Sequence, residues 1–180
     1  MVNSKTFKIV LSGLMIAVTA ICAQISIPFG AVPFTLQIFA IFLTASILPP
    51  VYAFLSLLGY VLLGLFGVPV FAGLKGGASV VFGATGGYIL TFPIAAFLSS
   101  YLIHKNYFKN AIINLAIPMI LGLLLIYIDG FLYLSYAAHM SLKKAFMVGV
   151  APFIIFDLIK IGLVIFVHQA LKVRKVLNNA

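Results

Sequence analysis

This sequence is poor in acidic residues, in cysteine and in charge. Two of its 180 residues are acidic, one is a cysteine (Cys22), and 7% are charged. A single cysteine excludes a disulfide within the chain and a cysteine metal cluster. With two acids, neither a Ser/His/Asp arrangement nor a pair of catalytic carboxylates is visible. No nucleotide-binding motif is present either. We therefore expect that the chain is not an enzyme and that any nucleotide hydrolysis is carried out by another subunit.

Histidine is the remaining candidate metal ligand, and it is scarce as well. His104, His139 and His168 form no His-x-x-His or His-Glu pair. The spacing typical of zinc sites is therefore missing from the sequence. We expect no metal and no cofactor.

Apolar residues, in contrast, dominate the chain. They make up 64% of it, and the mean hydropathy is +1.29. Soluble domains carry roughly 45–50% apolar and about 25% charged residues, and a particle this small cannot hide such an excess from water. The composition predicts an all-α integral membrane protein and excludes a soluble enzyme. Despite the net charge of +9, no basic patch with interleaved aromatics indicates a nucleic-acid partner.

Apolar runs divide the chain into six predicted transmembrane helices within one domain, residues 1–180. A helix needs about 20 apolar residues to cross a bilayer. No A-x-A-like cleavage site follows the first run, so we expect a retained span rather than a signal peptide. The runs cover residues 7–27, 34–48, 51–66, 79–103, 110–128 and 145–171.

The distribution of cations predicts the orientation of these helices. Seven cations fall on the side that carries both termini: Lys5, Lys8, Lys105, Lys109, Lys172, Arg174 and Lys175. Three fall on the other side: Lys75, Lys143 and Lys144. The positive-inside rule then predicts that both termini are cytoplasmic. Residues 28–33, 67–78 and 130–144 would lie together outside.

Two ionisable residues interrupt the last apolar run. An ionised residue near the centre of a membrane helix costs about 2.5–3.5 kcal/mol, so such residues usually serve a purpose. Asp157 and Lys160 are three residues apart, which places them on one helix face. They form either a structural ion pair or a polar clamp for a neutral ligand edge that both donates and accepts hydrogen bonds. We favour the clamp because the pair lies on the outer half of its helix.

Three further segments carry residues that suit either packing or ligand contact. The glycine-rich segment 83–88 contains Thr85, Gly86 and Tyr88, and glycine permits close approach of a ligand or a helix. Thr35 can cap the second helix, and Gln37 needs a polar partner within an apolar run. Lys75, in the glycine-rich segment 67–78, either attracts an anionic ligand or is simply solvated.

The first helix carries a pair of small residues four positions apart. Gly13 and Ala17 form a small-xxx-small pair, which lets another helix approach closely. The neighbouring helix belongs either to the same bundle or to a partner protein.

Five stretches of the chain together carry a resemblance to a known family. In chain order they are Ala23-Gln24-Ile25-Ser26-Ile27-Pro28, Val32-Pro33-Phe34-Thr35-Leu36-Gln37, Gly67-Val68-Pro69-Val70-Phe71-Ala72-Gly73, Thr85-Gly86-Gly87-Tyr88 and the segment 152–160. The ordered set resembles the motifs of the BioY family, the biotin-specific S components of bacterial energy-coupling factor transporters. The similarity extends over about residues 10–165.

The resemblance implies a fold, a ligand and partners. It implies a six-helix S component of the plasma membrane that binds biotin in an outward-facing pocket and topples inward with it. It also implies assembly with a transmembrane coupling subunit and two cytoplasmic ATPases. Another small vitamin as the ligand, or a non-transporting membrane scaffold, are the alternatives that the residues themselves leave open.

The resemblance also assigns roles to individual residues. Asp157 and Lys160 would bind the ureido edge of biotin, while Gly13 and Ala17 would dock the coupling subunit. The pocket wall would include Thr35, Gln37, Thr85, Gly86 and Tyr88. Lys75 would face the carboxylate, and the apolar part of the ligand would pack against Phe34, Val70 and Phe71.

Overall fold

The computed structural model describes residues 4–173, which form a helical bundle with a small hairpin at one end. Within these residues there are eight helices and two short strands. They are α1 (Ser4–Gln24), β1 (Ser26–Ile27), β2 (Phe34–Thr35), α2 (Gln37–Ile47), α3 (Pro50–Leu65), α4 (Ala78–Val81), α5 (Gly86–Lys105), α6 (Ala111–Ala137), α7 (Leu142–Gly149) and α8 (Ile154–Val173).

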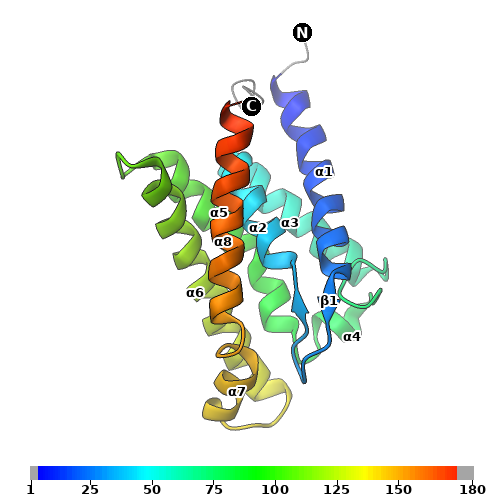
Figure 1. Ribbon diagram of the computed structural model, residues 1–180. Helices are drawn as coiled ribbons and strands as arrows, with labels where there is room; N and C mark the ends of the chain where they lie inside the picture. The colour runs from blue at the N-terminus through cyan, green and yellow to red at the C-terminus, as the bar shows by residue number, and fades with distance from the viewer. Residues whose placement is uncertain (1–3, 174–180) are drawn as a thin grey trace.

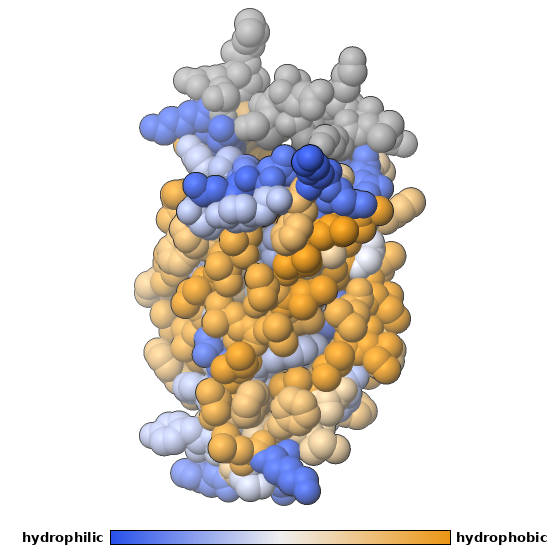
Figure 2. All heavy atoms as spheres, turned by 90° about the vertical axis from the view of Figure 1, so that its left-hand side faces the viewer, coloured by the Kyte–Doolittle hydropathy of each residue, from blue (hydrophilic) through white to orange (hydrophobic). Residues whose placement is uncertain are grey.

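The bundle has the size and surface of a multi-pass membrane protein. Four of its helices, α1, α5, α6 and α8, are long and apolar enough to cross a bilayer, and α2 and α3 are shorter apolar helices. Many large apolar side chains are exposed, for example Ile155 at 70% and Phe166 at 72% on α8. Figure 2 shows one face of the molecule, with an apolar band across its middle and hydrophilic residues toward both ends.

The connections between the elements gather at the two ends of the bundle (Figure 1). The start of α1, the end of α8 and the connection between α5 and α6 lie at one end, and the hairpin and α7 lie at the other. Residues 28–33, expected on the outer side, form the turn of the hairpin: Ser26 pairs with Thr35 and Ile27 with Phe34 in an antiparallel ladder. Arg174 and Lys175, which contribute to the predicted charge asymmetry, lie outside the described residues.

Helix α6 is longer than the sequence predicted, and the loop expected at residues 130–144 is mostly helical. The fifth apolar run was expected to end near residue 128, but α6 continues to Ala137. Polar side chains beyond that point have partners: Asp129 accepts a hydrogen bond from Thr91 (3.2 Å), and Tyr133 donates one to the carbonyl of Phe82 (3.1 Å). Because these groups are bonded, they do not require the helix to stop.

Two other predicted runs are each divided into two helices. The run at 79–103 consists of α4 and α5, separated by residues 82–85. The run at 145–171 consists of α7 and α8, separated by residues 150–153, which include Pro152. Proline has no backbone N–H to donate, so it favours such a break. Both breaks lie at the end of the bundle that carries the hairpin, where they leave irregular backbone beside the cavity described below.

Glycines allow the central helices to pack closely. A Cβ on Gly130 of α6 would overlap the buried ring of Tyr88, and one on Gly149 would overlap the Tyr88 hydroxyl. On Gly87 of α5, a Cβ would meet the backbone of Asp129 and the side chain of Tyr133. Such close contact between α5 and α6 is typical of membrane helix pairs, and it fixes Tyr88 beside the cavity.

Candidate ligand-binding site

A cavity of about 490 Å³ opens between the hairpin, the segment 71–75 and the inner faces of α2, α5, α6 and α8. Ligand pockets usually measure about 300–1,000 Å³ and combine an apolar lining with a few polar groups. The lining here follows that pattern. Its aromatic members are Phe29, Phe71, Tyr88, Phe92, Tyr127 and Phe153, and its charged members are Lys75, Asp157 and Lys160.

The deepest polar element of the site is the ion pair between Asp157 and Lys160. The Lys160 Nζ lies 2.6 Å from the Asp157 Oδ1, and the two residues are 4% and 3% exposed, respectively. Both point inward from α8, whose outer residues Ile155 and Ile159 are exposed. Asp157 is in the first turn of α8, where the helix dipole favours a negative charge. The one-face placement expected from the spacing is what the structure has.

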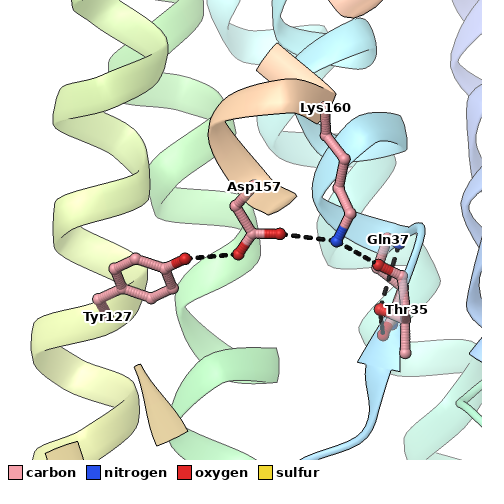
Figure 3. Close-up of polar contacts among 5 residues, drawn as sticks. All are labelled: Thr35, Gln37, Tyr127, Asp157 and Lys160. Atoms are coloured by element: carbon pink, nitrogen blue, oxygen red, sulfur yellow. Dashed lines mark hydrogen bonds and ion pairs between the residues drawn. The ribbon is translucent and has the colours of Figure 1, made fainter. Parts of the chain in front are cut away.

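Both members of the pair have further partners (Figure 3). The Tyr127 hydroxyl on α6 donates to the Asp157 Oδ2 at 2.6 Å. The Lys160 Nζ donates to the Thr35 carbonyl at 2.7 Å and lies 4.0 Å from the centre of the Phe34 ring. A buried charge requires partners of this kind, because removal from water is costly. The two charges bond each other, and both residues also line the cavity. The geometry is therefore compatible with a structural ion pair and with a polar clamp for a ligand.

Hydrogen bonds continue from Thr35 into the bundle. The Thr35 hydroxyl donates to the Gln37 Oε1 (3.0 Å) and accepts from the Gln37 backbone N–H (3.2 Å). Helix α2 begins at Gln37 with Leu36 at its N-cap position and no side-chain cap, so Thr35 does not cap the helix as expected. Thr35 lies in β2, and its hydroxyl accepts a hydrogen bond from the Gln37 backbone N–H instead. The Gln37 Nε2 donates to the Tyr60 hydroxyl on α3 (2.8 Å), which donates to the Val70 carbonyl (3.0 Å).

Most of the predicted pocket residues line the cavity, but Phe34, Val70 and Gly86 do not. Those that line it are Thr35, Gln37, Phe71, Lys75, Thr85, Tyr88, Asp157 and Lys160. Phe34 lies instead against Lys160 and stacks on Phe153, with ring centres 6.4 Å apart. Gly86 packs against the Val81 carbonyl and Tyr133, where a Cβ would not fit. Of the two readings for Gly86, close helix packing is the one that the structure shows.

The hydrogen-bond partners of Tyr127 and Tyr88 could not be foreseen from the sequence. Tyr127 anchors the Asp157 carboxylate, and the only signal for it was a hydroxyl within an apolar run that would need a partner. The hydroxyl of Tyr88 donates to the Gly149 carbonyl at the end of α7 (2.9 Å). Tyr88 thereby ties α5 to the break before α8 and keeps its ring in the cavity wall.

The small residues of α1 face away from the bundle. Gly13 and Ala17 are both exposed. The space beside Gly13 is open: among the described residues, a Cβ at this position would have no neighbour from another part of the chain within 4 Å. Gly13 therefore does not pack against another helix of the same bundle, which was one of the two expected roles.

The fold is that of a multi-pass membrane protein with a cavity lined by a buried ion pair, and comparisons with known proteins specify its family. The BioY family matches residues 1–178, and the chain belongs to this family.

Relatives and a solved structure agree with this assignment. The chain is 42% identical over 168 residues to the biotin transporter BioY of Thermotoga maritima, covering 93% of this chain and 96% of the relative. It is 39% identical over 168 residues to the probable biotin transporter BioY of Pyrococcus horikoshii, covering 93% and 98%. A crystal structure of the S-component for biotin from an ECF-type ABC transporter superposes with a TM-score of 0.88 at 27% identity, covering 96% of this chain and 94% of that one.

The burial of the ion pair predicts how the protein responds when one partner is removed. Breaking a buried pair leaves an uncompensated charge and costs about 3–5 kcal/mol, whereas replacing both partners by apolar residues is often neutral. We expect Asp157→Leu and Lys160→Met each to lower the free energy of unfolding by about this amount. The double variant should recover most of the loss. Thermal unfolding in detergent, without ligand, measures this.

Lys143→Met, at an exposed lysine of α7, is the matched control and should leave the unfolding temperature nearly unchanged. A double variant that is less stable than both single variants would contradict a mutual dependence of the two charges.

Proposed function

We propose that this protein is the substrate-binding S component of an energy-coupling factor transporter and takes up biotin across a bacterial plasma membrane. The observation that carries the proposal is the buried Asp157–Lys160 pair facing a cavity of suitable size. The family assignment supports it, because the named relatives are biotin transporters.

The ureido edge of biotin complements this pair. The edge has two N–H donors flanking one carbonyl acceptor, and a carboxylate accepts while an ammonium donates. Each Asp157 oxygen holds one hydrogen bond from a side chain and keeps a second lone pair for a ureido N–H. Lys160 directs two of its three N–H groups to Asp157 and Thr35, and the third is available to the ureido oxygen.

The apolar part of biotin fits the remaining lining. Phe71, Phe92 and Phe153 contribute to the cavity wall, and Ile38, Ile89 and Ile126 fill the space between them. The fused ring and the valeryl chain would replace water against these side chains, which is favourable in proportion to the apolar area buried. Lys75 is exposed at the rim of the cavity, where its ammonium would meet the carboxylate at the end of the chain.

Within the membrane, six helices of one domain would span the bilayer, namely α1, α2, α3, α5, α6 and α8. The cations at the end that holds the start of α1 support placing both termini in the cytoplasm. The cavity would then open outward. The exposed Gly13–Ala17 face would dock the transmembrane coupling subunit, and two ATPase subunits would supply the energy, so this chain would itself catalyse no reaction.

Titration of biotin into the purified, ligand-free protein tests the function directly. We expect a dissociation constant below micromolar, about −8 kcal/mol or tighter, by calorimetry in detergent. Asp157→Asn and Lys160→Ala should weaken binding at least 100-fold, since each removes one half of the ureido clamp. Tyr127→Phe should weaken it about tenfold, because the carboxylate loses its anchor.

Lys143→Ala, remote from the cavity lining, should bind biotin as the unmodified protein does. The absence of heat from a folded sample at several temperatures would exclude biotin as the ligand. Unchanged affinity in all three site variants would show that the ligand binds elsewhere.

The proposed contact between Lys75 and the ligand carboxylate can be tested with a biotin derivative that lacks the negative charge. Exposed ion pairs contribute about 0.2–1 kcal/mol. We therefore expect Lys75→Gln to weaken biotin binding about two- to fivefold and to leave the affinity for biotin methyl ester unchanged. Equal losses for the acid and the ester would argue against contact between Lys75 and the carboxylate. Lys144→Gln is the control for a general effect of removing an outer cation.

The docking face predicts a separation of binding from transport. Gly13→Leu and Ala17→Leu would block the close approach of a partner helix. We expect biotin uptake by cells expressing the complete transporter to fall at least tenfold, while biotin binding by the isolated variants is retained. Gly162→Leu is the matched control, because Gly162 is an exposed helical glycine with equally open space around it. Full uptake by both α1 variants would place the docking surface elsewhere.

A further inference from the structure

The last side chain of α1 reaches across to the segment that forms one wall of the cavity. The Gln24 Nε2 lies 3.3 Å from the Val70 carbonyl oxygen and 3.1 Å from that of Phe71. It also lies 3.2 Å from the Ala20 carbonyl oxygen on its own helix, so its two N–H groups are shared among three carbonyls. The Gln24 Oε1 accepts a hydrogen bond from the Leu74 N–H at 2.9 Å. One amide therefore contacts three backbone groups that are 46 to 50 residues away along the chain.

The segment held by Gln24 is a tight turn with an unfavourable backbone. Phe71 and Lys75 pair across it, with N–O distances of 2.9 and 3.3 Å. Gly73 has φ +72° and Leu74 has φ +55°, and a left-handed conformation is uncommon for leucine. The Leu74 side chain is 70% exposed and gives the turn little packing support. Its backbone bond to Gln24 is therefore a principal constraint on this conformation.

The turn forms part of the cavity wall, whereas Gln24 does not line the cavity. Phe71, Ala72, Gly73 and Lys75 line the cavity, and Gln24 is not among the lining residues. The Val70 carbonyl that Gln24 contacts also accepts from Tyr60, and the hydrogen bonds continue through Gln37 and Thr35 to Lys160. Gln24 thus connects the end of α1 both to the cavity wall and to the buried ion pair.

We infer that Gln24 is a positioning residue that holds the turn 70–75 closed over the cavity, so that α1 sets the rate at which ligand leaves. The inference rests on the proposed function for the identity of the ligand. The wall itself depends on hydrogen bonds within the chain. Loss of these bonds releases the turn from its left-handed conformation and opens one side of the site.

Gln24→Met tests this inference, because methionine has a similar length and shape but forms none of the three hydrogen bonds. In the unliganded protein we expect amide hydrogen exchange in residues 70–77 to become at least tenfold faster. With biotin, we expect the dissociation rate to rise at least tenfold while the association rate changes less than threefold. A general loss of structure would instead accelerate exchange throughout the bundle.

Two further variants make the outcome specific. Ser12→Ala removes a local hydrogen bond to the Lys8 carbonyl on the same helix, remote from the cavity, and should change neither measurement. Gln24→Glu keeps an acceptor for the Leu74 N–H but turns a carboxylate toward two carbonyls, so exchange should be faster at residues 70–71 than at Leu74.

Unchanged exchange in residues 70–77 of Gln24→Met would overturn the inference. Faster exchange with an unchanged dissociation rate would also overturn it, since the turn would then not retain the ligand. If the unmodified protein binds no biotin, the proposed function fails, while the exchange measurement still decides whether Gln24 holds the turn.

Discussion

A charge buried in a membrane protein must be neutralised and hydrogen-bonded where it lies, and this constraint organises the structure around Asp157 and Lys160. Both residues are almost inaccessible to solvent, so neither could be tolerated alone. Their partners come from two other parts of the chain: Tyr127 on α6, and Thr35 and Phe34 on β2. The need to neutralise and hydrogen-bond these two charges therefore fixes the positions of the hairpin, α6 and α8 relative to one another.

From this pair, a continuous series of hydrogen bonds crosses the bundle to α1. Its members are Tyr127, Asp157, Lys160, Thr35, Gln37, Tyr60, Val70 and Gln24. Each hydroxyl in the series donates once and also has room to accept, so the directions of the bonds are mutually consistent. Inside a low-dielectric bundle such bonds reinforce one another, and an interruption leaves polar atoms unpaired. The series joins the cavity to helices that do not line it.

The sequence predicted those features that depend on local spacing or on the cost of burial. The inward face shared by Asp157 and Lys160 follows from their separation, and the membrane class follows from the composition. Contacts between distant segments could not be predicted in this way. Nothing near Gln24 indicates a turn 50 residues away, and nothing distinguishes Tyr127 from its neighbour Tyr133 on the same helix. The end of α6 was misjudged because Asp129 is bonded to Thr91 on another helix.

The polar centre of this site carries its own counter-charge. Asp157 and Lys160 lie 2.6 Å apart and sum to zero, so together they form a dipole rather than a fixed charge. A membrane voltage of 100 mV acts on each elementary charge with about 2.3 kcal/mol, but the net force on a neutral pair vanishes in a uniform field. Translation of this centre across the bilayer therefore moves no net charge, and rotation of the pair contributes only in proportion to its 2.6 Å charge separation, which is small against a hydrocarbon core of about 30 Å. The full charges of the cargo and of the rim lysine would respond to the voltage more strongly.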